Sequence, residues 1–284
     1  MKSRREIKRE AKQAFAEQRG SAIFVLFWLI LINGVLSWIG SRISLLPAAG
    51  FVGRIIPLAG MLVTGVLAIN TAGTFVKIYK KESIRARDPF SDMAVNFPRK
   101  FGGFCWLLLW YFLWSLPYMV AVIMLSGATL GSGGFYAALF FTIVLLIPAI
   151  IKAISYSMAQ YILAGCLNVT AVNALRLSIR MTNGYKGKLF VLALSFIGWG
   201  ALGILPFVLT GIVAGLNDIG DAALSLLINF GSLLFAIFYT VYLGPYIFSA
   251  YAGFYIELRK EAIATGKIDP AEFDGAPPSI PSAE

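Results

Sequence analysis

Long uncharged stretches alternate with shorter charged ones along most of the chain. An α-helix needs roughly 20 apolar residues to cross a hydrocarbon core of about 30 Å. The uncharged run at 101–151 is too long for one crossing, and the glycine-rich turn at 127–134 divides it into two. The pattern therefore predicts an all-α integral membrane protein with six transmembrane helices. These are expected at about 20–41, 55–76, 101–126, 132–152, 189–216 and 222–244, the last continuing as a helix to 257.

The first charged stretch, 1–19, predicts a basic amphipathic helix. Ser3 and Glu6 have the spacing of a capping box. The apolar positions fall on one helical face: Ile7, Ala11, Ala14 and Phe15. A basic helix with a narrow apolar face is expected to lie on an anionic membrane surface. The alternative, a solvated helix beside the first span, stays open.

Basic residues lie almost entirely on one side of the predicted bundle. Of the 24 Lys and Arg residues, all except Arg42, Arg54 and Lys152 fall before residue 20, within 77–100 or 165–188, or after residue 258. Because cytoplasmic loops carry an excess of Lys and Arg, this places both termini in the cytoplasm. It also assigns the net charge of +10 to contacts with anionic lipid headgroups, and no nucleic-acid partner is expected. We divide the chain into the basic helix, a membrane domain at 20–258, and a tail.

The tail, residues 259–284, is polar and contains four prolines, so we expect it to be disordered.

The composition of the whole chain also indicates a membrane protein. Hydrophobic residues make up 58% of the chain and charged residues 13%, against about 25% charged residues in a soluble domain. The composition thus supports localisation in the cell membrane.

Several absences argue against an enzyme. The chain contains no histidine, which is the commonest general base and metal ligand. The predicted spans contain no Asp or Glu, and no phosphate-binding P-loop motif occurs. We therefore expect no catalytic activity, no metal and no cofactor.

Two segments resemble a known family. The segment at 147–200 begins IPAIIKAISYSMAQYILA, and the segment at 244–259 reads GPYIFSAYAGFYIELR. Both are similar to the bacterial multi-pass family known as domain of unknown function 975, and the basic REIKREAKQA near the start is similar too. The resemblance implies an integral protein of the bacterial cytoplasmic membrane and brings no activity with it. Family members often carry an acidic residue after the YIL segment, where this chain has Ala164-Gly165-Cys166.

A first candidate site combines four cations near a predicted surface helix at 170–181. Arg176 and Arg180 share one face of this helix, and Lys186 and Lys188 follow the turn after it. Arginine and lysine side chains in this arrangement predict a site for an anion or a lipid headgroup. Alternatively, the helix is interfacial and its arginines meet the headgroups without forming a defined site.

A second candidate site surrounds the lysine of the fourth span. An ionisable residue within a membrane is a functional hypothesis by default, and two spans contain late prolines that can open a polar space. The members of this possible cavity are Lys152, Tyr156, Tyr161, Tyr246 and Tyr251, with Tyr255 next to them. Alternatively, the lysine extends to the interface and the tyrosines form an aromatic belt.

Two functions remain open from the sequence. The first is a non-enzymatic membrane accessory or scaffold protein that engages anionic lipid or another membrane protein through its basic segments. The second is a passive transporter or channel-like protein for a small molecule or lipid. A hydrated cavity at Lys152 and Tyr156 would favour transport, and a dry, packed core there would oppose it.

Overall fold

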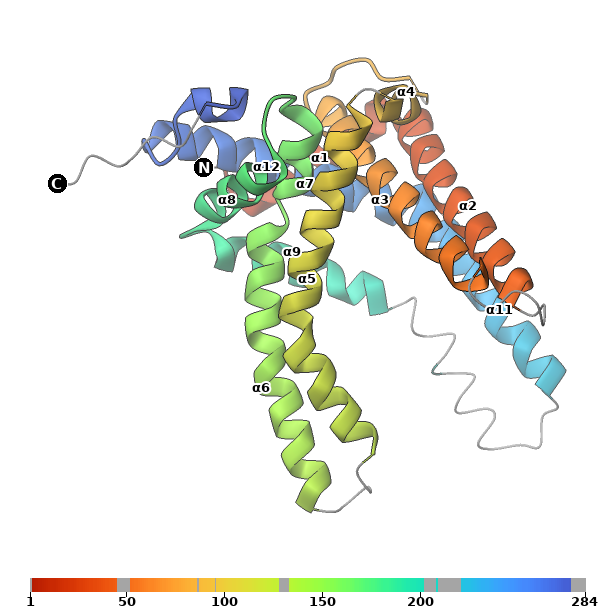
Figure 1. Cartoon of the computed structure of the whole chain (residues 1–284). Coiled ribbons are helices and arrows are strands. Elements are labelled where there is room, and N and C mark those ends of the chain that lie inside the picture. Colours follow the sequence, from red (N-terminus) through yellow and green to blue (C-terminus); the bar gives the residue numbers. More distant parts are fainter. Residues whose placement is uncertain are drawn as a thin grey trace.

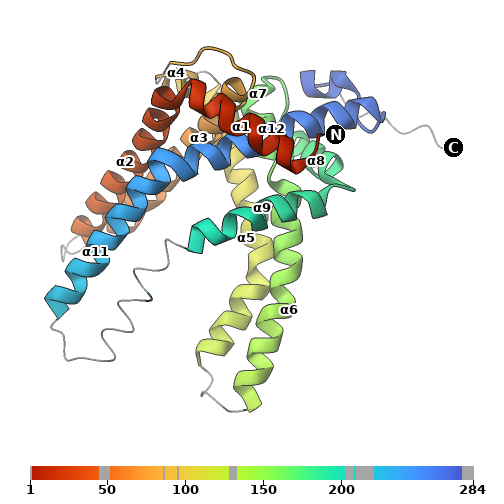
Figure 2. The same cartoon turned by 180° about the vertical axis from the view of Figure 1, so that it is seen from behind.

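The computed structural model describes residues 2–44, 52–85, 87–94, 96–127, 133–201, 208 and 221–276, and every secondary-structure element in them is a helix. The helices form two parts, which we call the head and the arms (Figures 1 and 2). The head consists of α1 (Arg4–Glu17), α4 (Asp88–Ala94), α7 (Ala159–Gly165), α8 (Ala171–Thr182), α12 (Gly244–Ala264) and the short helix η2 (Pro270–Asp274).

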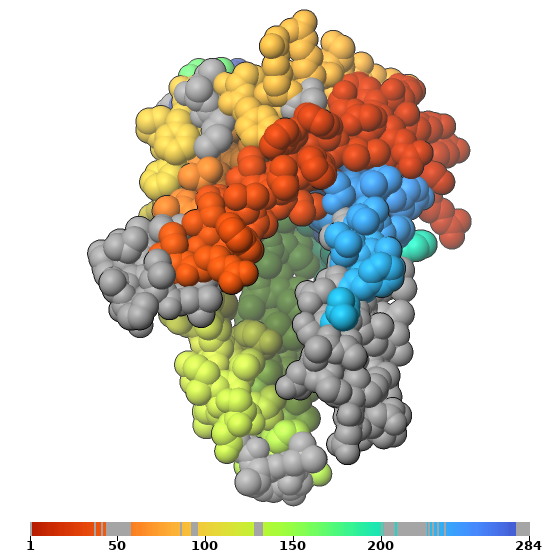
Figure 3. Space-filling model, turned by 90° about the vertical axis from the view of Figure 1, so that its right-hand side faces the viewer, coloured from red at the N-terminus to blue at the C-terminus, as the bar shows by residue number. Residues whose placement is uncertain are grey.

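The arms are long apolar helices that extend from one side of the head (Figure 1). One arm is the hairpin of α2 (Arg19–Ser44) and α3 (Val52–Tyr79), with α11 (Asp221–Phe238) beside it. The other arm is the hairpin of α5 (Phe97–Ser126) and α6 (Gly133–Tyr156), which projects away from the head in the space-filling view (Figure 3). A further helix, α9 (Lys186–Ala201), crosses behind α5 and α6 in Figure 1.

In the part of the chain that the structure describes, five helical stretches are long and apolar enough to cross a membrane. They are Arg19–Gly40, Leu58–Tyr79, Phe97–Ser126, Gly133–Gly165 and Leu233–Ala264. The first four correspond to the first four predicted spans. Of the fifth predicted span, 189–216, only the part in α9 and residue 208 are described, and the rest lies outside the described residues. The chain is therefore an all-helical protein with several helices suited to a membrane.

The last predicted span continues into the head through a π-helical turn. The turn, Tyr239–Leu243, joins α11 to α12, and Pro245 follows it directly. Proline lacks the N–H that would continue the α-helical ladder, which favours such an irregularity. Gly244 lets α2 approach closely here, because a Cβ on it would lie 2.8 Å from Cδ1 of Leu26. The chain thus changes direction where α11 meets the head (Figure 2).

The first helix forms as predicted but does not rest its apolar face on a membrane. Ser3 and Glu6 make the capping box: the N–H of Glu6 donates to Ser3 Oγ at 3.3 Å, and the N–H of Ser3 donates to Glu6 Oε2 at 2.8 Å. The predicted apolar face is buried in the hydrophobic core, and α1 packs against α12 and α3. The expectation of a membrane-lying apolar face is therefore wrong, because two helices distant in sequence cover that face.

The prediction of a disordered tail is also wrong for residues 259–276. Helix α12 continues to Ala264, and Asp269 and Glu272 form a capping box at the start of η2. Ile268 and Phe273 are both 1% exposed within the core of the head. Two apolar side chains and a capped turn are enough to order this segment, although its composition is polar. Residues 277–284 lie outside the described residues.

Candidate anion-binding site

A pocket of about 510 Å³ lies in the head, where α3, α5, α7 and α12 meet. Its charged lining is strongly unbalanced: among the described residues that line it, Glu82 is the single carboxylate. The cationic lining residues are Lys77, Lys80, Lys100, Arg259 and Lys260. We call this space the basic pocket.

Helical spacing brings these side chains together from two long helices. On α3, Asn70, Gly73 and Lys77 are spaced three or four residues apart and lie on one face, and Lys80 follows directly after the end of the helix. On α12, the neighbouring pair Arg259 and Lys260 follows Tyr255 and Ile256 by one turn. Lys100, in the first turn of α5, is only 3% exposed and contributes a buried ammonium group.

A glycine sets the width of the pocket between α3 and α7. A Cβ added to Gly73 would lie 2.9 Å from Cβ of Ala164, so these helices contact each other with almost no side-chain spacer. Small residues allow this kind of close helix packing. The contact keeps α7 and its Tyr161 against the lysine-bearing face of α3, and so it positions one wall of the pocket.

Two cations of the pocket lie beside described carboxylates. Lys80 Nζ lies 3.8 Å from Glu82 Oε1, and both side chains are about half exposed. Lys260 Nζ lies 3.6 Å from Glu257 Oε1. Arg259 places its guanidinium 4.4 Å from the ring centroid of Phe273, which is a cation–π contact. Among the described lining residues the cations outnumber the carboxylates, which favours the binding of an anion.

Two buried polar atoms in the lining make no close hydrogen bond in the described part of the chain. Asn70 Nδ2 donates to the carbonyl of Pro89 at 3.0 Å, but Asn70 Oδ1 is buried and unpaired. The buried hydroxyl of Tyr255 makes no close hydrogen bond but lies beside the Cys166 thiol and the Arg259 side chain, and its ring stacks on that of Tyr161 at 5.5 Å. Buried polar atoms are normally satisfied, so Asn70 Oδ1 is a position at which a ligand or water would complete the bonding.

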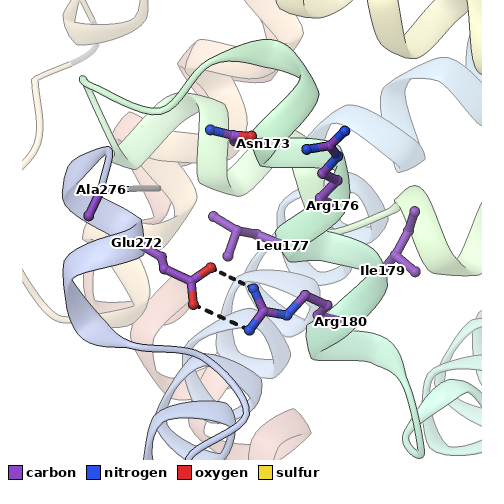
Figure 4. Close-up of a pocket in the computed structure, with 7 residues that line it drawn as sticks. All are labelled: Asn173, Arg176, Leu177, Ile179, Arg180, Glu272 and Ala276. Carbon is purple, nitrogen blue, oxygen red and sulfur yellow. Dashed lines mark hydrogen bonds and ion pairs between the residues drawn. The ribbon is translucent and has the colours of Figure 1, made fainter. Parts of the chain in front are cut away.

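The first predicted site is divided in the structure. Arg180 Nη1 donates to Glu272 Oε2 at 2.5 Å, and Nη2 donates to Oε1 at 3.2 Å (Figure 4). Arg176 is exposed and lines a small pocket of about 220 Å³ together with Arg180 and Glu272. Lys188 lines a different pocket, with Lys2 and Arg4.

Lys186 lines neither of these two pockets. The four cations of the first predicted site are therefore not one site. The reason is that η2, which the sequence indicated as disordered, supplies Glu272, and this carboxylate already binds Arg180.

The second predicted site is divided as well. Lys152 and Tyr156 line a groove between α5 and α6, whereas Tyr161 lines the basic pocket. Tyr246 packs edge-on against Phe196 at 5.4 Å, and Tyr251 packs against the core. The predicted tyrosines thus occupy separate places instead of lining one cavity.

The cations of the basic pocket were missed at the sequence level. Each one flanks an apolar stretch, where basic residues are common at the membrane boundary, and the three segments that supply them are far apart in the chain. The local signal was closeness in sequence: Lys77 and Lys80 are three residues apart, and Arg259 and Lys260 are adjacent. Convergence of these pairs depends on the packing of α12 on α3, which no local pattern reports.

The fold and the pocket together define a class: an all-helical protein with membrane-length apolar arms and a basic pocket in the head that joins them. More particularly, the chain belongs to the family described as Protein of unknown function (DUF975), whose model matches residues 1–262. The match includes the arms and all the residues that line the basic pocket except Ile263, and it ends before η2. No curated protein and no solved structure matches the chain.

Proposed function

We propose that this chain is a non-enzymatic accessory or scaffold protein of the bacterial cytoplasmic membrane, and that it binds phosphate-bearing anions, above all lipid headgroups, in the basic pocket. In this account it has six spans, and the head and both termini lie in the cytoplasm. The observation that carries the proposal is the lining of the pocket, with five cationic side chains and one carboxylate in about 510 Å³.

The cytoplasmic side is supported by the charge distribution. The loops on the head side hold nearly all of the Lys and Arg residues, which is typical of cytoplasmic loops. Lys or Arg near an anionic leaflet contributes about 1 kcal/mol of attraction per residue. A head that carries many of them at the base of apolar arms is therefore drawn to headgroup phosphates.

The chemistry of the lining suits binding better than turnover. Ammonium and guanidinium groups donate charge-assisted hydrogen bonds to phosphate oxygens. Glu82, the carboxylate among the described lining residues, lies beside Lys80 and has no second acid next to it in that lining. Paired carboxylates or a histidine base would support hydrolysis, and the chain has no histidine.

The test compares two triple variants that lose the same charge. One is Lys77→Gln/Lys80→Gln/Lys260→Gln in the basic pocket, and the control is Arg5→Gln/Arg9→Gln/Lys12→Gln on the exposed face of α1. The probes are a short-chain phosphatidylglycerol and inorganic phosphate, titrated into protein held in phosphatidylcholine nanodiscs. The titration with lipid tests headgroup binding, and the titration with phosphate tests binding of a free anion.

We expect the pocket variant to bind at least one of the probes roughly tenfold or more weakly, because it loses charge-assisted hydrogen bonds. The control should bind like the unchanged protein, since its charges lie outside the pocket. Equal affinities of the two variants would contradict the proposal, because they would show that only net charge matters.

A second candidate function, passive lipid or small-molecule transport, is favoured by the groove at Lys152. This groove lies beside apolar helix faces and holds a charged side chain, which a transport path for a polar group would need. The test is the rate at which dithionite bleaches a fluorescent headgroup lipid in proteoliposomes. Bleaching no faster or more complete than in protein-free liposomes would argue against lipid transport.

A further inference from the structure

The groove between α5 and α6 combines one charged side chain with apolar walls. It has a volume of about 510 Å³, and Lys152 is the charged member of its described lining. The walls include Leu108, Phe112, Trp114, Ala149 and Tyr156. Met61 of α3 also lines it, so the groove lies on the side of this arm that faces the other arm.

Lys152 lies in the last turns of α6, four residues before the helix ends at Tyr156, and its side chain contacts the middle of α5. Its Nζ is 4.4 Å from the ring centroid of Trp114 on α5. At 1.5 Å per residue, Trp114 is about 20 Å along the helix from Phe101, where the uncharged stretch begins. By the same rise, Lys152 is about 28 Å from Gly133 at the far end of α6. The ammonium group therefore lies beside the middle of α5, although Lys152 itself is near the head end of α6.

The chain provides no carboxylate for this ammonium group in the hairpin. Residues 101–156 contain no Asp or Glu. The contact with Trp114 is a cation–π interaction, which recovers only part of the hydration that a lysine loses in an apolar site. A charged residue placed in this way needs a counter-ion, and an external anion can provide it.

The position of the groove determines what kind of anion can enter. Its surroundings are apolar and outward-facing: Phe112, Ile147 and Ile151 on α5 and α6 are all exposed on the surface of the arm. A small hydrated anion would have to leave water to reach Lys152. An anion attached to an acyl chain would enter from the lipid and would bury that chain against these side chains.

We propose that the groove binds an acidic amphiphile, whose acid group pairs with Lys152 Nζ and whose acyl chain lies along α5 and α6. The acid group is a carboxylate or a phosphate, because either provides oxygens that accept from an ammonium group. A volume of about 510 Å³ is within the usual range of 300–1,000 Å³ for small-molecule sites. The groove shares no lining residue with the basic pocket, so the two sites can be tested separately.

The experiment uses the tryptophans of α5 as reporters. Trp106, Trp110 and Trp114 follow one another along this helix, and bromine quenches tryptophan fluorescence only at short range. The protein is held in phosphatidylcholine nanodiscs and titrated with dibromostearic acid or with its methyl ester, which has the same chain and no charge. A second titration compares brominated phosphatidylglycerol with brominated phosphatidylcholine, so that fatty acids and phospholipids are distinguished as sources.

In at least one of the two titrations, we expect the acidic probe to bind roughly tenfold more tightly than the matched probe without net charge, as one charge-assisted hydrogen bond would produce. Lys152→Gln should remove this difference, and Lys152→Arg should retain it because the charge remains. Lys80→Gln, a matched change in the basic pocket, should also retain it.

Equal quenching by the acidic probe and its matched probe without net charge, in both titrations, would overturn the proposal. A difference that survives in Lys152→Gln would overturn it as well. If Lys152→Gln does not fold, the comparison of probes in the unchanged protein and in Lys152→Arg still decides. Headgroup binding at the basic pocket should be unaffected by Lys152→Gln, so failure here is distinguishable from failure of the proposed function.

Discussion

The head and the α5–α6 arm use phenylalanine in opposite ways. Phe254 on α12 of the head is 1% exposed, and Phe75, in the part of α3 that packs against α12, is 0% exposed. On α6, Phe140 and Phe141 are 62% and 57% exposed, and their neighbours along the arm are equally outward-facing. The same side chain is covered by protein in one region and needs an apolar solvent in the other. This contrast shows that the two regions are adapted to different surroundings.

Polar groups follow the same division. Where α5 begins beside the head, Arg99 Nη1 donates to the carbonyls of Cys166 and Val169 at 2.8 and 2.9 Å, and Nη2 donates to that of Leu163 at 2.6 Å. One side chain thus binds carbonyls at the C-terminal end of α7 and in the segment that follows it. In the arms, the helical backbone satisfies itself, as it must in lipid.

The largest expected effect comes from truncating the same residue type in both regions. Phe75→Ala should lower the free energy of unfolding by about 3–5 kcal/mol, because it leaves a cavity in the core and removes the stacking on Phe248 at 5.2 Å. Phe140→Ala should change it by no more than about 0.5 kcal/mol, because lipid fills the space. Thermal unfolding in detergent measures both. Equal losses would show that α6 is packed against protein.

The second effect comes from placing a charge on each surface. Ile143→Arg puts a guanidinium on the exposed face of α6, about 15 Å along the helix from Gly133. In lipid this should cost about 2.5–3.5 kcal/mol and reduce membrane insertion. Val172→Arg on the exposed face of α8 should insert normally. The measurement is the membrane-integrated fraction of each variant, and normal insertion of Ile143→Arg would argue against a lipid-facing α6.

The third effect concerns the ion pair that holds η2 to α8. Arg180→Ala removes a bidentate partner from Glu272, which is 4% exposed, and should destabilise this part of the head by about 1–3 kcal/mol. Arg176→Ala, one turn away and exposed, is the control and should have little effect. Hydrogen exchange of residues 268–275 reports the result. Unchanged protection in Arg180→Ala would show that the ion pair does not hold η2.

The smallest effect is a pH dependence of the docking of α1. Hydrogen bonds from Lys2 and from the Tyr79 hydroxyl lower the pKa of Glu10 below its usual value. These bonds therefore stabilise the fold above pH of about 4.3, and this stability is lost as the pH falls through the lowered pKa. The contribution should be below about 1 kcal/mol, because Glu10 is partly exposed.

Glu10→Gln should accordingly lower the melting temperature slightly at pH 7 and leave it less dependent on pH below 4.3. Glu17→Gln, which removes an exposed pair with Lys81, is the matched control. If Glu10→Gln and the unchanged protein lose stability in parallel on acidification, another group is responsible.

Local features of the sequence predicted local features of the fold. The capping box of Ser3 and Glu6 and the apolar face of α1 were both predicted correctly, because both depend on residues that follow one another at intervals of at most four positions. The identity of the helices that cover this face was not predicted, since α12 follows α1 by more than two hundred residues.

Parts of the candidate site were beyond reach for a related reason. The tail looked disordered by composition, although Asp269 and Glu272 have the spacing of a capping box that composition ignores. The basic pocket depends on α3 and α12 packing side by side, and its cations look like ordinary flanks of membrane spans. Lys152 was identified because a charge within an apolar stretch is conspicuous without any tertiary information.

Hydroxyl-radical footprinting of the unchanged protein in nanodiscs tests the division into head and arms most directly. The account predicts that Met119 and Phe140 on the arm remain unmodified despite their exposure on the protein, because lipid shields them from water-borne radicals. Leu167 and Val172 on the head, which are exposed to a similar degree, should be oxidised. Oxidation of Met119 and Phe140 as readily as of Leu167 would contradict the account.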